Sequence, residues 1–93
     1  MSNYIIVFDR RASDYKIFHE QLTGHPRISN WWHYIKSMYI VKTDLTVQEL
    51  SAHVRKSFAA QGIDDTHVVL KVDLSSRQGM LTKEAWEWIR KNA

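Results

Sequence analysis

The sequence contains no cysteine, a single proline and three glycines in 93 residues. Without cysteine, the chain has neither a disulfide framework nor a thiolate metal site, which fits a reducing compartment. No apolar run approaches the ~20 residues that a membrane-spanning helix needs. The first run, Tyr4 to Phe8, is also too short for a signal-peptide core and is closed by Asp9. These absences predict a soluble, cytoplasmic protein.

A strong excess of charge of one sign is also absent. The chain carries 13 Lys and Arg against 10 Asp and Glu, for a formal net charge of +3, and five histidines that add positive charge when protonated. A mildly basic balance suits either a nucleic-acid partner or an ordinary solvated surface. No linker or repeat is visible, and the length fits one domain over residues 1–93.

The first part of the chain predicts a strand followed by a helix. Residues 4–8, YIIVF, are apolar on both alternating faces, which is typical of a strand covered on both sides. Ser13 is then a candidate N-cap, and Gly24 is expected to end the helix. The apolar stripe of this helix is Tyr15, Phe18 and Leu22.

The stretch SNWWHYIKSMYIVKT is rich in aromatic and β-branched residues without a helical period. It predicts two strands, roughly Ser29–Ile35 and Met38–Thr43, that break near Lys36-Ser37. No Gly or Asn marks the break, so a single bent strand stays open. Trp31 and Trp32 must point to opposite faces of a strand. One ring is expected beneath the helices and the other at a subunit interface or in solvent, with base stacking as an alternative.

The second half predicts a helix, a strand and a further helix. Thr46 and Glu49 form a capping box, and Gly62 closes the helix that they start. Residues 66–74, THVVLKVDL, predict a strand, and Thr82 is a candidate cap for a short terminal helix that carries Trp86 and Ile89. One face of this strand is apolar and the other carries several polar residues. This pattern predicts an edge strand whose polar face is exposed to solvent. The apolar face is Val68, Leu70, Val72 and Leu74, and the polar residues are His67, Lys71 and Asp73.

The order βαββαβ with an additional short C-terminal helix predicts an α+β, ferredoxin-like fold with the first and third strands in the middle of the sheet. Two helices cover only one face of such a sheet. Alternate residues of YIIVF and MYIVK would leave the other face apolar, which is unusual in a monomer. We therefore expect a homodimer that packs sheet to sheet, with Trp31, Trp32 and Tyr39 at its interface.

These residues also resemble a known family. A strand ending in Phe8-Asp9, a helix, WWHYIKSMYIVKTDLTVQEL leading into a second helix, and a hydrophobic strand are similar to the CRISPR-associated protein 2 superfamily. The stand-alone SinR-family members are the most similar, and their mark is a Trp-x-x-Tyr/Trp-hydrophobic-Val strand pair before a Thr-capped helix. The resemblance covers most of residues 3–74. Toxins of the virulence-associated protein D type have a related fold.

The resemblance implies a dimer and, for some members, a metal-dependent endonuclease. The implied ligand is an Asp at the end of the first strand of each subunit, which by motif is Asp9, and the implied metal is Mg²⁺. The family's serine in the second-strand region corresponds to Ser37. Other members hold DNA without cleaving it, so Asp9 would then be structural.

Three further side chains are candidates on their own chemistry. Arg10 and Arg11 follow Asp9 and have the guanidinium fork that suits phosphate contacts, although a solvated turn would also account for them. His33 is a candidate general base, or else a hydrogen-bonded, half-buried histidine. The histidines have no zinc-ligand spacing, so we expect no zinc.

Three functions therefore stay open. The first is a homodimer that binds RNA or DNA and cleaves it with Mg²⁺ at Asp9. The second is a non-catalytic dimeric adapter. The third is a toxin-like ribonuclease of a toxin–antitoxin pair, whose catalytic residues the sequence does not identify. One carboxylate per chain is short of the convergent groups that enzymes use, so whether the protein is an enzyme stays open.

Overall fold

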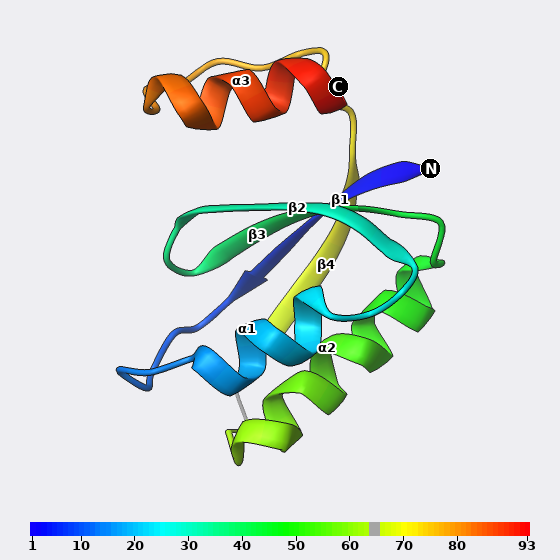
Figure 1. Cartoon of the computed structure of the whole chain (residues 1–93), viewed down its shortest axis with the longest axis vertical. Helices are drawn as coiled ribbons and strands as arrows, with labels where there is room; N and C mark the ends of the chain where they lie inside the picture. Colours follow the sequence, from blue (N-terminus) through cyan, green and yellow to red (C-terminus); the bar gives the residue numbers. More distant parts are fainter. Residues whose placement is uncertain (64–65) are drawn as a thin grey trace.

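The computed structural model describes residues 1–63 and 66–93 and contains a four-stranded antiparallel sheet with helices on both faces (Figure 1). The strands lie in the order β2-β3-β1-β4, so the prediction that the first and third strands are central is confirmed. The α+β class is confirmed as well. The elements are β1 (Ser2–Phe8), α1 (Lys16–Thr23), β2 (Ile28–Ile35), β3 (Met38–Thr43), α2 (Val47–Gln61), β4 (His67–Val72) and α3 (Lys83–Asn92).

Residues 28–43 form a hairpin rather than one bent strand. Ile35 pairs with Met38, and the chain turns at Lys36 and Ser37. The Phe8 amide donates a 3.0 Å hydrogen bond to the Ser37 carbonyl, which ties this turn to the end of β1. The turn therefore lies beside the loop that follows β1.

The first helix begins later than the sequence predicts. Ser13 is not its N-cap, because α1 begins at Lys16 and Tyr15 occupies the cap position without a side-chain capping bond. The amides of the first turn find other acceptors: Lys16 donates to the Asp14 carboxylate and Phe18 donates to the side-chain carbonyl of Gln61. A tertiary contact from the end of α2 thus replaces the local cap.

The ends of α2 agree with the prediction. Thr46 accepts from the Glu49 amide while the Glu49 carboxylate accepts from the Thr46 amide, which completes the capping box. Gly62 ends the helix in the left-handed region at φ 76°, where a side chain would be strained. Thr82 also caps α3 as predicted, by accepting from the Ala85 amide.

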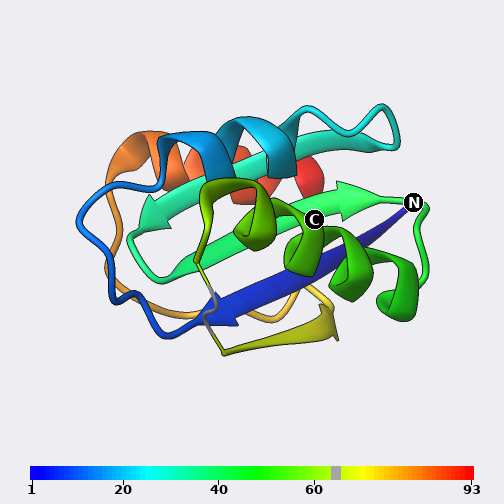
Figure 2. The ribbon, with the colours of Figure 1, turned by 90° about the horizontal axis from the view of Figure 1, so that it is seen from below.

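The two sheet faces carry separate cores (Figures 1 and 2). Helices α1 and α2 cover one face, and α3 crosses the other. The first core contains alternate β1 residues together with the apolar stripes of α1 and α2; its rings include Phe8, Phe18 and Phe58. The second core contains Trp32 and Ile40 beneath Ala85 and Ile89. The expectation that two helices leave the second face bare was therefore wrong, because α3 covers its β2–β3 half.

The edge position of β4 is confirmed. However, the face that carries Val68 and Leu70, which was expected to be buried, is exposed to solvent. Val68 and Leu70 are 47% and 51% exposed, whereas Val69 packs against the first core. The cause is the position of α3, which contacts β2 at the other side of the sheet. Leu74 leaves the strand and is buried in the second core. Within the described ranges, no helix has the length and apolarity needed to cross a bilayer.

Candidate functional site

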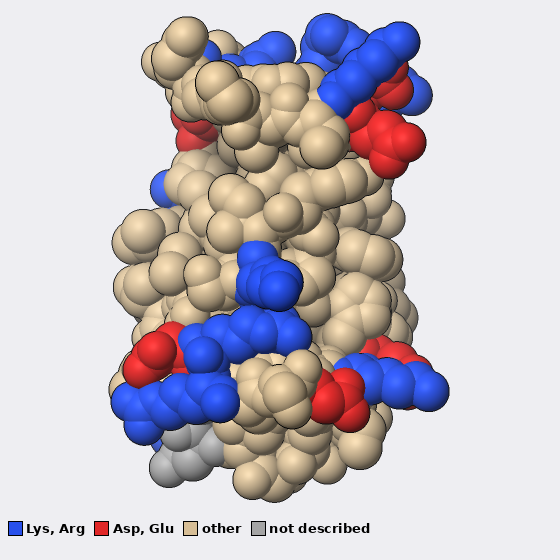
Figure 3. Space-filling view, turned by 90° about the vertical axis from the view of Figure 1, so that its left-hand side faces the viewer, with Lys and Arg blue, Asp and Glu red and all other residues tan. Residues whose placement is uncertain are grey.

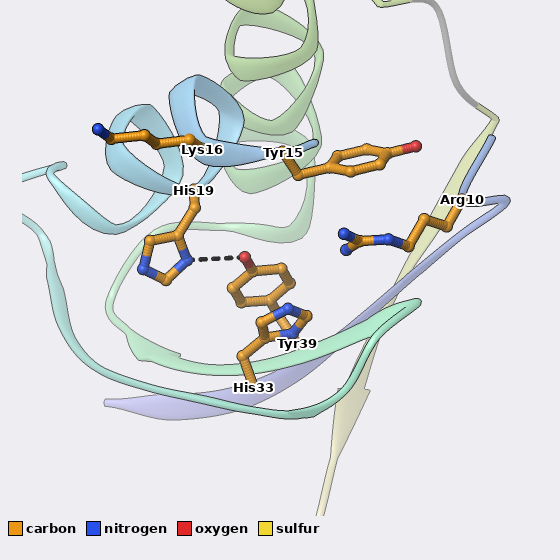
Figure 4. A pocket seen from close by; sticks show the side chains of 6 residues that line it. All are labelled: Arg10, Tyr15, Lys16, His19, His33 and Tyr39. Atoms are coloured by element: carbon orange, nitrogen blue, oxygen red, sulfur yellow. Dashed lines mark hydrogen bonds between the residues drawn. The ribbon is translucent and has the colours of Figure 1, made fainter. Parts of the chain in front are cut away.

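A cavity of about 330 Å³ opens between α1, the loop after β1 and the β2–β3 hairpin (Figure 4). The described residues that line it are basic or aromatic, and none carries a carboxylate: Arg10, Tyr15, Lys16, His19, His33 and Tyr39. They come from three separate segments of the chain. The fold therefore gathers two fixed positive charges, two imidazoles and two phenols around one opening.

His33 is held by a hydrogen bond and by stacking. Its Nδ1 lies 2.9 Å from the Met38 carbonyl oxygen, and its ring stacks on Tyr39 with centroids 3.9 Å apart and planes 2° from parallel. Because a carbonyl only accepts, Nδ1 carries the proton and Nε2 of the neutral ring has a lone pair. Burial lowers the pKa of His33 below its ordinary value. The nearby His19 and Arg10 lower this pKa further, against the effect of the Met38 bond.

His19 is oriented by two aromatic neighbours. Its Nδ1 lies 2.8 Å from the Tyr39 hydroxyl, and the Trp31 ring meets it edge-on with centroids 4.7 Å apart. Burial raises the pKa of Tyr39 to about 12, so the phenol stays protonated at neutral pH. The centroids of the His19 and His33 rings are 6.2 Å apart, and Tyr39 contacts both rings.

Arg10 is fixed at the opposite side of the cavity. Its guanidinium carbon lies 4.2 Å from the centroid of the Tyr15 ring, and Nη1 donates a 3.2 Å bond to the Lys36 carbonyl. A cation over an aromatic face is held in place while its remaining N–H groups stay available to a ligand. Figure 4 shows the Arg10 guanidinium directed toward the Tyr39 and His33 rings, with His19 beyond the Tyr39 hydroxyl.

Positive charge extends beyond the cavity itself. Figure 3 shows Lys and Arg side chains gathered over the lower part of the face that carries the loop after β1 and the start of α1. The acidic side chains on this face lie mostly at its margins. A basic concave site with few nearby carboxylates attracts anions, and phosphate is one of the anions that arginine and lysine bind.

Trp31 and Trp32 point to opposite faces, as predicted. Trp32 is 1% exposed beneath α3, and its indole N–H donates to the Ala85 carbonyl at 3.2 Å. Trp31 is 39% exposed and lies against His19 at the margin of the cavity. The predicted interface role does not fit Trp32 or Tyr39, because each is 1% exposed within a single chain and offers no surface to a partner.

Asp9 lies apart from the cavity. Its carboxylate is exposed and accepts a 2.9 Å bond from Nε of Arg11, so these two predicted residues pair with each other. Among the described residues there is no group of three or more His, Asp or Glu placed to hold a metal ion. Ser37 is in the hairpin turn and does not line the cavity. Of the predicted site residues, the structure brings Arg10, His33 and Tyr39 together at the cavity.

Sequence reasoning missed Tyr15, Lys16 and His19 as site residues. A signal was present, because Tyr15 and His19 are four residues apart, a spacing that places two side chains on the same side of a helix. Tyr15 was assigned to the core stripe alone, and it is in fact buried as well as facing Arg10. The contact between His19 and Tyr39 joins α1 to β3 and has no sequence signature.

Comparison with known proteins gives no further guide to this site. No protein-family model, no curated protein and no solved structure matches the chain. The resemblance to the CRISPR-associated protein 2 superfamily therefore stays a prediction.

Proposed function

We propose that this chain binds single-stranded RNA, with a backbone phosphate in the basic cavity and a base stacked on Trp31. The observation that carries the proposal is the convergence of Arg10, Lys16 and the two imidazoles on one cavity whose described lining has no carboxylate. The scaffold is a ferredoxin-like βαββαβ domain with the terminal helix α3 added to its second face. This proposal keeps the predicted nucleic-acid partner and the predicted phosphate contact of Arg10, and it assigns no contact to Asp9.

The exposed Trp31 ring supports a single strand rather than a duplex. Bases in single strands are free to stack on aromatic side chains, and each such contact contributes ~1–3 kcal/mol. Trp31 is the half-exposed tryptophan beside His19, so a base on its free surface would lie next to a phosphate in the cavity. The two contacts together match one nucleotide of a flexible strand.

Fluorescence anisotropy with a labelled RNA 10-mer tests the proposal. We expect Arg10→Gln/Lys16→Gln to weaken binding at least ~10-fold, since a hydrogen bond to a charged group contributes ~1.5–3 kcal/mol. The slope of log K against log salt should become shallower by ~0.7, because one phosphate loses its neutralising side chains. The matched control is Arg90→Gln/Lys91→Gln, which removes the same charge from exposed positions at the end of α3. Equal losses in the two variants would contradict a site at the cavity.

We also propose that two copies pair through β4. Val7, Val68 and Leu70 are 37%, 47% and 51% exposed, and β1 and β4 bring them together on the half of the second face that α3 leaves open. Antiparallel pairing of two β4 edges centred on Val69 would set Val68 of one copy opposite Leu70 of the other. This arrangement is self-complementary, as a two-fold interface requires.

Light scattering of Leu70→Lys tests the pairing. The wild type should have the mass of a dimer and Leu70→Lys that of a monomer, because two lysines would face the apolar strip. Ile17→Lys on α1 is the control, since Ile17 is 48% exposed and lies on the opposite side of the sheet. A monomeric wild type at micromolar concentration would contradict the proposed pairing and leave the RNA site unaffected.

A further inference from the structure

We infer that acid separates the two paired copies of this chain, because His67 of each copy lies opposite Lys71 of the other. This inference rests on the proposed pairing through β4 and adds to it a contact between the copies that responds to pH. The contact is at the edge of the sheet, so it is independent of the RNA cavity.

The backbone groups of β4 determine which residues can pair with a second copy. The Asp9 amide donates a 3.1 Å bond to the Thr66 carbonyl, one step along the ladder from the Phe8–His67 pair. In an antiparallel ladder, the residues of a strand alternate between those bonded to one neighbour and those whose backbone groups point to the other side. Thr66 therefore directs its backbone groups toward β1, and His67 directs them away.

The outward-facing residues of β4 are symmetric about Val69. They are His67, Val69 and Lys71, and β4 is the outermost strand on this side of the sheet (Figure 2). Two antiparallel copies centred on Val69 would join these backbone groups into one continuous ladder. In that register, His67 of one copy is directly opposite Lys71 of the other, and the two-fold axis makes the same pair occur twice.

The side chains of this pair share one face of the sheet. Val69, between them, packs against the first core, and alternate residues of a strand lie on the same face. Residues directly opposite each other in an antiparallel pair have Cβ atoms ~4.5–5.5 Å apart, and like charges at this distance are destabilising. A protonated His67 would therefore be repelled by the Lys71 ammonium of the second copy, whereas a neutral imidazole would not.

The surroundings of His67 within one chain favour the neutral imidazole. Its Nε2 lies 2.9 Å from the Ser51 hydroxyl of α2, which can donate to the ring or accept from it. Burial lowers the pKa of His67, and the charge of Arg55 on α2 lowers this pKa further. The Asp9 carboxylate lines a cavity with His67, and it accepts a bond from Nε of Arg11.

Pairing should therefore release protons. The Lys71 ammonium of the second copy lowers the pKa of His67 in the pair below its value in the single chain. As pH falls, a single chain consequently binds more protons than a paired one, and acidification favours separate chains. The dissociation constant should rise ~10-fold between pH 7.5 and pH 5.5, since two like-charge pairs then oppose the contact.

Analytical ultracentrifugation of the full chain over a dilution series at these two pH values tests the inference. Lys71→Glu is the decisive variant. It places a carboxylate opposite His67, so acid should tighten the pairing of this variant instead of weakening it. Lys71→Gln and His67→Gln should each give a dissociation constant that changes less than about twofold between the two pH values, because one member of the charged pair is removed.

The matched control is Lys91→Glu. It makes the same change of charge at an exposed position near the end of α3, away from β4, so its dissociation constant should rise on acidification as that of the wild type does. Circular dichroism at both pH values establishes that each variant is folded. A change of sign between Lys71→Glu and Lys91→Glu is a result that a general loss of stability in acid would not produce.

The opposite results would overturn the inference. A dimer whose dissociation constant is the same at both pH values would end it and leave the proposed pairing standing. A dissociation constant that rises on acidification in Lys71→Glu as it does in the wild type would also end it, since the dependence would then come from another group. A wild type that is monomeric at both pH values would overturn the inference together with the pairing on which it rests.

Discussion

The two faces of the sheet are covered by different numbers of helices and carry cores of different size. On one face, α1 and α2 pack a continuous aromatic core in which the Phe18 and Phe58 rings stack at 4.3 Å. On the other face, a single helix holds a smaller core whose polar contacts run along β2, such as the 2.9 Å bond from the Trp88 indole to Asn30. The cavity opens only on the first face. The residues that stabilise α1 therefore also position the candidate site, whereas α3 stabilises the chain at a distance from it.

The largest effect is expected from Phe18→Ala. Phe18 is fully buried between Phe8, Tyr39 and Phe58, and it precedes His19 on α1. Loss of this ring should reduce the free energy of unfolding by ~3–5 kcal/mol, measured by urea titration. RNA binding should weaken with it, because α1 would no longer hold His19 and Lys16. Full binding in a destabilised variant would show that the first core and the site are independent.

A smaller effect is expected from Ile89→Ala on α3. Ile89 is 5% exposed in the second core, so its truncation should cost ~2–3 kcal/mol, toward the lower end for buried aliphatic residues because the single helix can relax. RNA affinity should stay within a factor of two of the wild type at a temperature where the variant is folded. A loss of affinity similar to that of Phe18→Ala would contradict the division between the two faces.

Trp32→Phe sharpens the comparison within β2. The change keeps an aromatic ring in the second core but removes the indole donor to the Ala85 carbonyl. The free energy of unfolding should fall by ~1–2 kcal/mol, because the hydrogen bond is lost and the ring is smaller.

Trp31→Phe is the companion variant. It should change the free energy of unfolding less, since Trp31 is half exposed, and it should weaken RNA binding because the smaller ring stacks less well on a base.

The smallest expected effect is the pH dependence of the free energy of unfolding. Burial lowers the pKa of His33 and of His67, both on the first face, below the ordinary value of 6.5. The unfolded chain therefore binds more protons just below pH 6.5, and the free energy of unfolding should fall as pH drops from 7.5 to 5.5. His67→Gln should reduce this slope in urea titrations across that range. A slope that is unchanged, or stability that rises on acidification, would contradict the burial of these imidazoles.

Much of the fold could be predicted because local signals determine it. Aromatic and β-branched content identified the strands, and Thr46, Gly62 and Thr82 marked helix ends where backbone geometry depends on nearby residues. The start of α1 was missed because Gln61, distant in sequence, satisfies its amides. The position of α3 was missed because a short amphipathic helix gives no indication of which half of a sheet it covers. The position of α3 also explains why the face of β4 that was expected to be buried is exposed.

The candidate site was predictable only in part. Arg10 and His33 could be proposed from residue type alone, and both line the cavity. The role of His19 depends on the contact between α1 and β3, which follows from packing rather than from spacing. Asp9, the residue that the family resemblance singles out, lies outside the cavity and pairs with Arg11.

The central claim is that the cavity on the first face binds an RNA phosphate, and an NMR titration tests it most directly. A ¹⁵N-labelled chain titrated with a short single-stranded RNA should show concentration-dependent shifts in the amides of Arg10, Lys16 and His19 and in the imidazole nitrogens of His33. The α3 amides should stay in place. Shifts confined to α3 or to the residues around Asp9, or no shifts at millimolar RNA, would contradict the account.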